Sequence, residues 1–134
     1  MRILLLEDDS LFSRTFSVAV AAAGHQVSLT SNFKEAIEQS SHFRPQVAVI
    51  DVMISGEPVS FRFLEDLRAI DPAIKIIIIT GYPEVGHFVR RSYPGVVRCL
   101  LKPFRRQQLL ELLEQLADEY NRENHFSEEK RRRG

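Results

Sequence analysis

The 134-residue chain is predicted to form one α/β domain, a doubly wound parallel sheet made of five β–α units. Five short apolar runs alternate with amphipathic segments, and this alternation favours a parallel sheet with helices on both faces. The run 47–51, VAVID, reads as a strand buried on both faces. Polar residues gather where these runs end, which is the edge at which open parallel sheets bind ligands.

The composition is that of an ordinary globular domain. Hydrophobic residues make up 44% and charged residues 27% of the chain, and 18 Lys and Arg balance 18 Asp and Glu. This balance creates no field that would attract nucleic acid or a membrane surface. One Cys excludes an internal disulfide, and no apolar run approaches the ~20 residues of a membrane span. We therefore expect a cytoplasmic protein without an N-terminal targeting signal.

The strands are expected at residues 3–6, 27–30, 47–51, 74–80 and 96–101. The helices are expected at about 11–23, 33–43, 61–70, 84–92 and 104–120. Asp9 or Ser10 can cap the first helix, Gly24 can stop it, and Asn32 with Glu35 resembles a capping box. Residues 52–60 read as a loop that contains Gly56.

The segment after residue 121 is polar and ends in an Arg-rich stretch. We expect a domain over residues 1–121, followed by a solvated tail or linker stump over 122–134. The three arginines at 131–133 are too few for a nucleic-acid arm, and Glu128 and Glu129 beside them weaken their field further.

Five polar residues at the expected strand ends form a candidate site. They are Glu7 and Asp8 after the first strand, Asp51 at the end of the third, Thr80 at the fourth and Lys102 after the fifth. Three carboxylates that lie close together repel one another unless a cation joins them, and Mg²⁺ prefers oxygen ligands. Asp51 could then act as a nucleophile, with the Lys ammonium and the Thr hydroxyl holding phosphoryl oxygens.

These residues stand in four segments with a familiar pattern: 3–9 (ILLLEDD), 49–54 (VIDVMI), 76–81 (IIIITG) and 101–104 (LKPF). Together and in this order, they resemble the receiver domain of two-component response regulators. The resemblance covers residues 1 to about 120. It implies a CheY-like, flavodoxin-like three-layer sandwich whose five strands lie in the order 2-1-3-4-5.

The resemblance also implies a phosphoacceptor role. Asp51 would accept a phosphoryl group from a sensor histidine kinase or a phosphotransfer protein, and the domain would then control a downstream effector. Mg²⁺ or Mn²⁺ would be held by Asp8, Asp51 and the main-chain carbonyl of Met53, with Glu7 assisting through water. Thr80 would be the switch hydroxyl, and Lys102, which precedes a cis proline in this family, would pair with the phosphoryl group.

Three positions depart from the family pattern. Ser55 stands where the family usually has Pro, the region of Val59 and Ser60 lacks the usual Gly, and Cys99 occupies the place of the switch aromatic. These departures keep open an alternative, a degenerate receiver that acts as a phosphorylation-independent binding or dimerisation module. The Leu-rich last helix could supply a homodimer face.

A catalytic role is the third alternative. A phosphatase with Asp51 as its covalent nucleophile would need a general acid, and Met53 stands where a second Asp could serve. We therefore expect a regulatory phosphoacceptor rather than an enzyme.

Overall fold

The computed structural model describes residues 1–133, without the side chains of residues 124–129, 131 and 133. The chain divides into two compact units, Met1–Pro103 and Phe104–Gly134. The first unit contains the sheet and every residue of the candidate site, and the second contains the last helix. No described helix combines the length and hydropathy needed to cross a bilayer.

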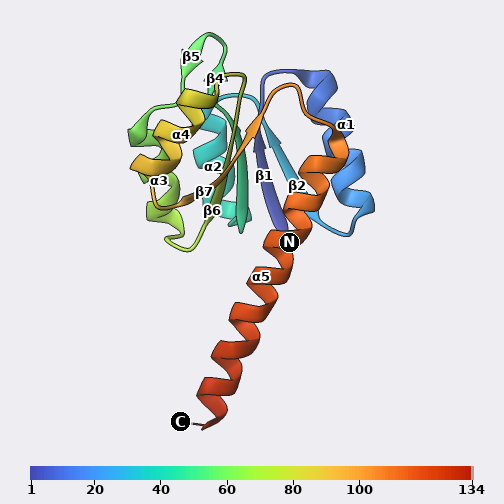
Figure 1. The fold of residues 1–134 in the computed structure, drawn as a ribbon, viewed down its shortest axis with the longest axis vertical. Coiled ribbons are helices and arrows are strands. Elements are labelled where there is room, and N and C mark those ends of the chain that lie inside the picture. Colours follow the sequence, from blue (N-terminus) through green and yellow to red (C-terminus); the bar gives the residue numbers. More distant parts are fainter. Residues whose placement is uncertain (134) are drawn as a thin grey trace. The chain divides into compact units, whose positions relative to one another are not determined.

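Five parallel strands form the central sheet, in the spatial order β2-β1-β3-β6-β7. They are β1 (Arg2–Leu6), β2 (Gln26–Thr30), β3 (Val47–Asp51), β6 (Lys75–Thr80) and β7 (Val96–Leu101). Because the labels β4 and β5 belong to a small hairpin, this is the expected order 2-1-3-4-5, and the predicted fold class is confirmed (Figure 1). The strand order reverses at β1, whose neighbours are β2 and β3, so the ligand-binding crevice of such a sheet lies at the carboxyl ends of β1 and β3.

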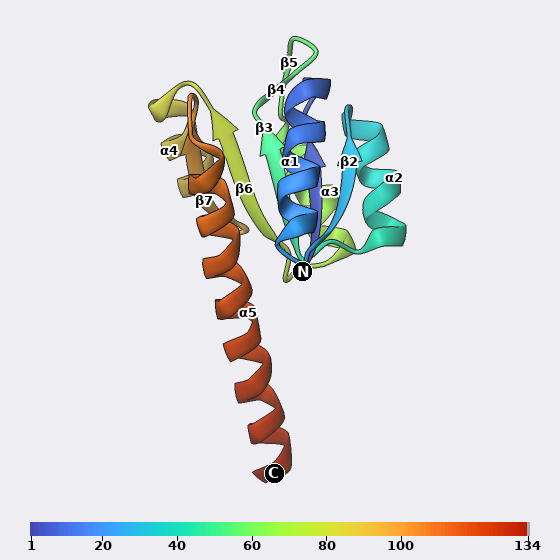
Figure 2. The same ribbon diagram turned by 90° about the vertical axis from the view of Figure 1, so that its right-hand side faces the viewer.

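Helices cover both faces of the sheet. The helices of the first unit are α1 (Ser10–Ala22), α2 (Phe33–Phe43), α3 (Phe61–Ile70) and α4 (Pro83–Ser92). On one face, even-numbered strand residues such as Leu4, Ile50 and Ile78 pack with buried residues of α2, α3 and α4. Odd-numbered residues of the three central strands, such as Ile3, Val49 and Ile77, point to the opposite face and are also buried, as are Phe16 and Val20 of α1. Figure 2 shows α1 and α2 on opposite sides of β1 and β2.

The predicted helix starts have clear physical causes. The Asp9 carboxylate accepts hydrogen bonds from the backbone N–H groups of Leu11 and Phe12, and Asn32 accepts one from Glu35. These side chains satisfy donors that the first turn of a helix leaves without partners. Gly24, with φ of +93°, follows the end of α1, in a backbone conformation that residues with a Cβ rarely adopt.

The segment between β3 and α3 is more ordered than the expected loop. Strands β4 (Met53–Ile54) and β5 (Glu57–Pro58) form an antiparallel hairpin, in which Met53 pairs with Pro58 and Ile54 pairs with Glu57. Ser55 and Gly56 make the two-residue turn, with φ of +50° and +78°. Positive φ at both central residues is the signature of a type I′ turn, which matches the twist of the two strands that it joins.

The last helix, α5 (Arg106–Arg133), contains 28 residues and continues beyond the expected end near Tyr120. The expected helix end was therefore wrong. Residues 121–133 contain Glu, Arg, Asn, Lys and Ser but neither Pro nor Gly, so no residue interrupts the backbone hydrogen bonds of the helix. Polarity predicted solvent exposure there, but it did not exclude a helix.

Candidate phosphoacceptor site

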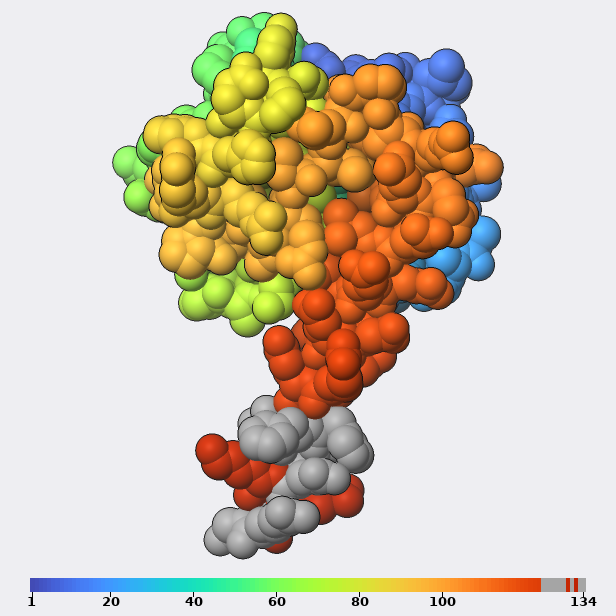
Figure 3. Space-filling model, viewed as in Figure 1, coloured from blue at the N-terminus to red at the C-terminus, as the bar shows by residue number. Residues whose placement is uncertain are grey.

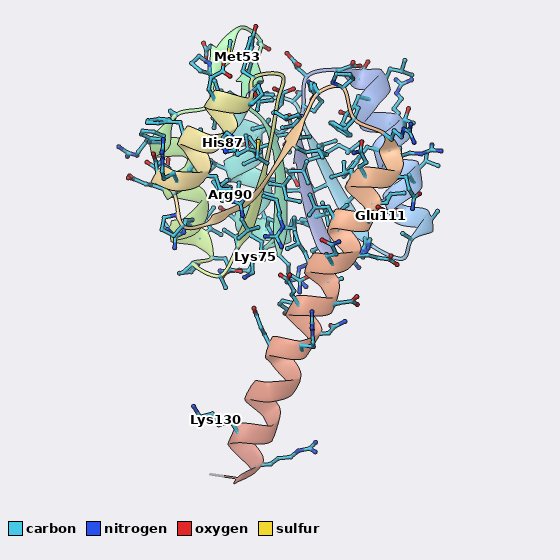
Figure 4. All side chains as sticks on the ribbon, in the orientation of Figure 1. Met53, Lys75, His87, Arg90, Glu111 and Lys130 are labelled. Carbon is cyan, nitrogen blue, oxygen red and sulfur yellow. The ribbon has the colours of Figure 1, made fainter. Side chains whose placement is uncertain are left out.

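The register of the sheet brings the predicted site residues to one edge. Leu6 is paired with Ile50, so Glu7 follows β1 at the level at which Asp51 ends β3. Thr80, the last residue of β6, is paired with Leu101, and Lys102 follows directly. The hairpin stands at the same end of the sheet. In Figure 4, Met53 of β4 lies at this end and Lys75, the first residue of β6, lies at the other.

Asp51 lies at the centre of the site and is only 7% exposed. Its Oδ2 accepts a hydrogen bond from the Lys102 ammonium at 2.5 Å, and its Oδ1 accepts one from the backbone N–H of Met53 at 2.9 Å. A buried carboxylate requires such charged or polar partners, because an isolated charge is costly to remove from water. The side chain is therefore held in one orientation at the strand end.

Lys102 joins the carboxylates of Asp51 and Glu7. Its Nζ lies 3.6 Å from Glu7 Oε2, in addition to the shorter contact with Asp51. Burial lowers the pKa of Lys102, but the hydrogen bond and attraction to Asp51, with the charge of Glu7, outweigh this effect and raise the pKa above its ordinary value. The ammonium therefore remains charged at neutral pH.

Glu7 is the most perturbed titratable group of the site. Burial, followed by the interaction with the Asp51 carboxylate, raises the pKa of Glu7 to about 7, against the lowering effects of the Asp9 N–H group and Lys102. Its Oε1 accepts the hydrogen bond from the backbone of Asp9, whereas Oε2 is buried and accepts no hydrogen bond. This oxygen is the only described buried carboxylate atom in that condition.

Asp8 is exposed and is held by a different partner. Its Oδ2 accepts a hydrogen bond from the backbone N–H of Ser55, at the turn of the hairpin, at 2.8 Å. This hydrogen bond, which outweighs the small effect of burial, lowers the pKa of Asp8 below its ordinary value. The Asp8 carboxylate is therefore ionised at neutral pH.

Thr80 is buried at the end of β6. Its Oγ1 accepts a hydrogen bond from the backbone N–H of Tyr82, at the start of α4, at 3.1 Å. Its main-chain carbonyl accepts the N–H of Lys102, which fixes the start of the loop after β7. A hydroxyl that accepts one hydrogen bond still has its own proton to donate. The Lys102–Pro103 peptide bond is cis, as the resemblance implied.

The donor set is suited to a hard divalent cation. In the described part of the chain, no three His, Cys, Asp or Glu side chains are arranged to hold a metal by themselves. Lys102 instead lies between two of the three carboxylates. Two carboxylates and one carbonyl would nevertheless be enough for Mg²⁺, which usually keeps several water ligands. If all three carboxylates were ionised, the single ammonium would leave a net charge of −2 at the site, which a divalent cation would neutralise.

The hairpin register explains how the carbonyl of Met53 is available. Val59 donates its N–H to Val52, and Ile54 pairs with Glu57 across the turn. Met53 lies between these hydrogen-bonded positions and opposite Pro58, which has no N–H. Its N–H and C=O therefore point away from the partner strand, and the N–H reaches Asp51. Sequence reasoning named this carbonyl from the family resemblance, but it did not foresee the hairpin, although the Ser55-Gly56 dipeptide is a turn signal.

The comparisons with known proteins agree on one family. A family model described as the response regulator receiver domain matches residues 3–114. The chemotaxis protein CheY of Listeria monocytogenes is 27% identical over 116 residues, which cover 85% of this chain and 97% of that protein. The uncharacterized transcriptional regulatory protein YesN of Bacillus subtilis is 28% identical over 93 residues, or 69% of this chain and only 25% of YesN.

Solved structures share the fold. A CheY-like response regulator receiver domain protein from Methanospirillum hungatei JF-1 superposes with a TM-score of 0.79 and 23% sequence identity, covering 91% of this chain and 97% of that chain. The non-phosphorylated HemR receiver domain of Leptospira biflexa superposes with a TM-score of 0.74 and 21% identity over 85% of this chain and 91% of that chain. At these identities the superpositions support the arrangement of strands and helices alone.

Proposed function

Because the chain belongs to the response regulator receiver domain family, we propose that Asp51 accepts a phosphoryl group in a two-component system. Receiver domains of this family are regulatory phosphoacceptors, not enzymes that turn over a substrate. The observation that supports the role of Asp51 most strongly is its carboxylate, which is buried at a strand end and bonded to the Lys102 ammonium. The proposed donor is the phosphohistidine of a sensor histidine kinase or of a phosphotransfer protein.

In the proposed transfer, one carboxylate oxygen of Asp51 forms a bond to phosphorus while the P–N bond of the phosphohistidine breaks. The imidazole leaves with the electron pair of that bond. The Lys102 ammonium now pairs with Asp51 Oδ2. After the transfer it can pair instead with a negatively charged phosphoryl oxygen. The Thr80 hydroxyl now accepts a hydrogen bond from the Tyr82 N–H. It can exchange this bond for one to the phosphoryl group, to which it donates its own proton.

A divalent cation, Mg²⁺ or Mn²⁺, is proposed to be held by Asp8, Asp51 and the Met53 carbonyl, with Glu7 acting through water. When bound, this cation supplies positive charge to the phosphoryl oxygens during transfer. The buried Oε2 of Glu7, which accepts no hydrogen bond, is an acceptor that a metal-bound water could satisfy. The cation would thereby reduce the electrostatic repulsion between the acidic side chains at neutral pH.

The partners proposed for the domain follow from this role. Receiver domains interact with histidine kinases and with effector domains, and several relatives of this chain are transcriptional regulators. For this chain we propose a downstream effector as the output partner, a second copy of the chain bound through the last helices, and a cytoplasmic location. No nucleic-acid contact is proposed for this chain itself.

Incubation with Mg²⁺ and acetyl phosphate, followed by intact-mass measurement, tests the phosphoacceptor. We expect one phosphoryl adduct that is lost at alkaline pH, is absent from Asp51→Asn, and is present in Asp71→Asn, which changes an Asp in the turn after α3. Persistence of the adduct in Asp51→Asn would show that another residue is modified. A wild-type protein that takes up neither Mg²⁺ nor phosphate would instead support the degenerate, phosphorylation-independent module.

A further inference from the structure

The turn of the β4–β5 hairpin is bonded to the loop that follows β1. Ser55 donates its backbone N–H to Asp8 Oδ2 at 2.8 Å, although 47 positions separate the two residues in the chain. Figure 3 shows the hairpin (green) at the same end of the first unit as the start of α1 (dark blue). The hydrogen bond therefore joins the hairpin turn to the exposed carboxylate of Asp8.

The conformation of the turn is what presents this N–H. Ser55 has φ of +50°, which residues with a Cβ rarely adopt, and Gly56 has φ of +78°. A proline at position 55 would lack the N–H and would require φ near −65°. A glycine there would keep the N–H and adopt the same φ without steric cost. Ser55→Gly therefore removes the side chain alone, whereas Ser55→Pro removes the N–H donor together with the turn conformation that presents it.

The base of the same hairpin contacts Asp51. Met53 donates its N–H to Asp51 Oδ1, and the hairpin register directs the Met53 carbonyl away from β5. One two-stranded element thus contacts Asp8 at its turn and Asp51 at its base, where Met53 also presents its carbonyl. These are the three groups proposed above to hold the cation.

We propose that Ser55 is a positioning residue, whose backbone N–H fixes the Asp8 carboxylate so that the cation ligands are arranged before the cation binds. This inference rests on the proposed Mg²⁺ site. Oδ2 of Asp8 accepts the Ser55 hydrogen bond, and a carboxylate has two oxygens with about four acceptor positions, so Oδ1 remains for a cation. Holding a ligand in place in advance reduces the entropy that binding must otherwise remove.

The test compares Ser55→Pro with its matched control Ser55→Gly, using calorimetric titration with Mg²⁺ in the full chain. We expect Ser55→Pro to raise the Kd for Mg²⁺ by about tenfold, the lower end of the effect of removing an outer-shell partner of a metal ligand. Ser55→Gly should stay within about twofold of the wild type. Circular dichroism and urea unfolding establish that both variants are folded.

Amide hydrogen exchange in metal-free protein gives a second measurement that does not depend on Ser55→Pro. We expect the Ser55 N–H to be protected in the wild type and to exchange at least about tenfold faster in Asp8→Ala, because its acceptor is then missing. An unprotected Ser55 N–H in the wild type would overturn the proposal. So would an equal Mg²⁺ affinity of folded Ser55→Pro and wild type.

The result for the wild type separates this inference from the proposed function. If the wild type binds Mg²⁺ and accepts phosphate while Ser55→Pro binds Mg²⁺ equally well, only the positioning role is overturned. If the wild type binds no Mg²⁺, both the positioning role and the proposed cation site are overturned.

Discussion

Replacing Gly86 with Ala tests how closely α4 is seated on the sheet. Gly86 is buried in the middle of α4, and a Cβ placed on it would lie 2.1 Å from Cys99 Sγ and 3.3 Å from Cys99 Cβ in β7. The Cβ would also lie 3.5 Å from Thr80 Cγ2, an ordinary contact distance. The contact with sulfur is far shorter than the 3.5–4.0 Å of a favourable van der Waals contact. Either the Cys99 side chain or the helix must therefore move.

Two opposing terms set the size of the effect. Ala favours a helix interior over Gly by about 1 kcal/mol, whereas overpacking a well-packed core costs about 1–3 kcal/mol. Because the clash is severe on the sulfur, we expect Gly86→Ala to lower the free energy of unfolding by about 1–2 kcal/mol. The measurement is urea denaturation followed by circular dichroism.

A double-mutant cycle with Cys99→Ala isolates the contact. Removing Sγ leaves only the 3.3 Å approach to Cβ, so Gly86→Ala in the Cys99→Ala background should be close to neutral or stabilising by up to about 1 kcal/mol. The expected coupling between the two positions is about 1–3 kcal/mol. If Gly86→Ala stabilises the wild type as much as it stabilises Cys99→Ala, the close seating of α4 on Cys99 is refuted.

Two further predictions concern charge and capping. The pKa of Glu7 is raised to about 7, above its ordinary value near 4.5, so the stabilising, protonated form is present below pH 4.5 and is lost as the pH rises through 7. Metal-free protein should therefore lose stability progressively between about pH 4.5 and 7, and Glu7→Gln should flatten this dependence in urea titrations at each pH; an unchanged slope would contradict the assignment. Asp9→Ala removes the acceptor of two N–H groups of α1 and should cost about 1 kcal/mol, whereas Asp9→Ser should restore most of it; equal midpoints for the two variants would contradict the capping role.

Patterns within the sequence were sufficient for the sheet and for most helix starts. The run at β3 is apolar on both faces, and burial of all five of its residues confirms that reading. Asp9 and Asn32 cap helices because their short side chains reach backbone donors that lie two or three residues ahead. Such features depend on neighbours in the chain, which the sequence displays directly.

The features that escaped prediction depend on distant contacts or on weak local preferences. The turn at Ser55 and Gly56 is a recognisable signal, but its bond to Asp8 joins segments 47 residues apart. The extension of α5 to Arg133 arises in a polar segment whose composition fits either a helix or an unstructured tail. The seating of α4 on Cys99 follows from a glycine in a helix, which taken alone only lowers helix propensity.

The register of the β4–β5 hairpin limits how the chain between Asp51 and α3 can vary in length. Successive residues of a strand alternate in whether their carbonyls face the partner strand or point away from it, and only the outward carbonyls are free to serve a neighbouring site. One residue inserted between Met53 and the turn would exchange these two sets and turn the Met53 carbonyl toward β5. A pair of residues inserted into the same strand, with a matching pair in β5, would preserve the alternation and merely lengthen the hairpin. Homologous loops that keep this arrangement are therefore expected to differ by even numbers of residues per strand.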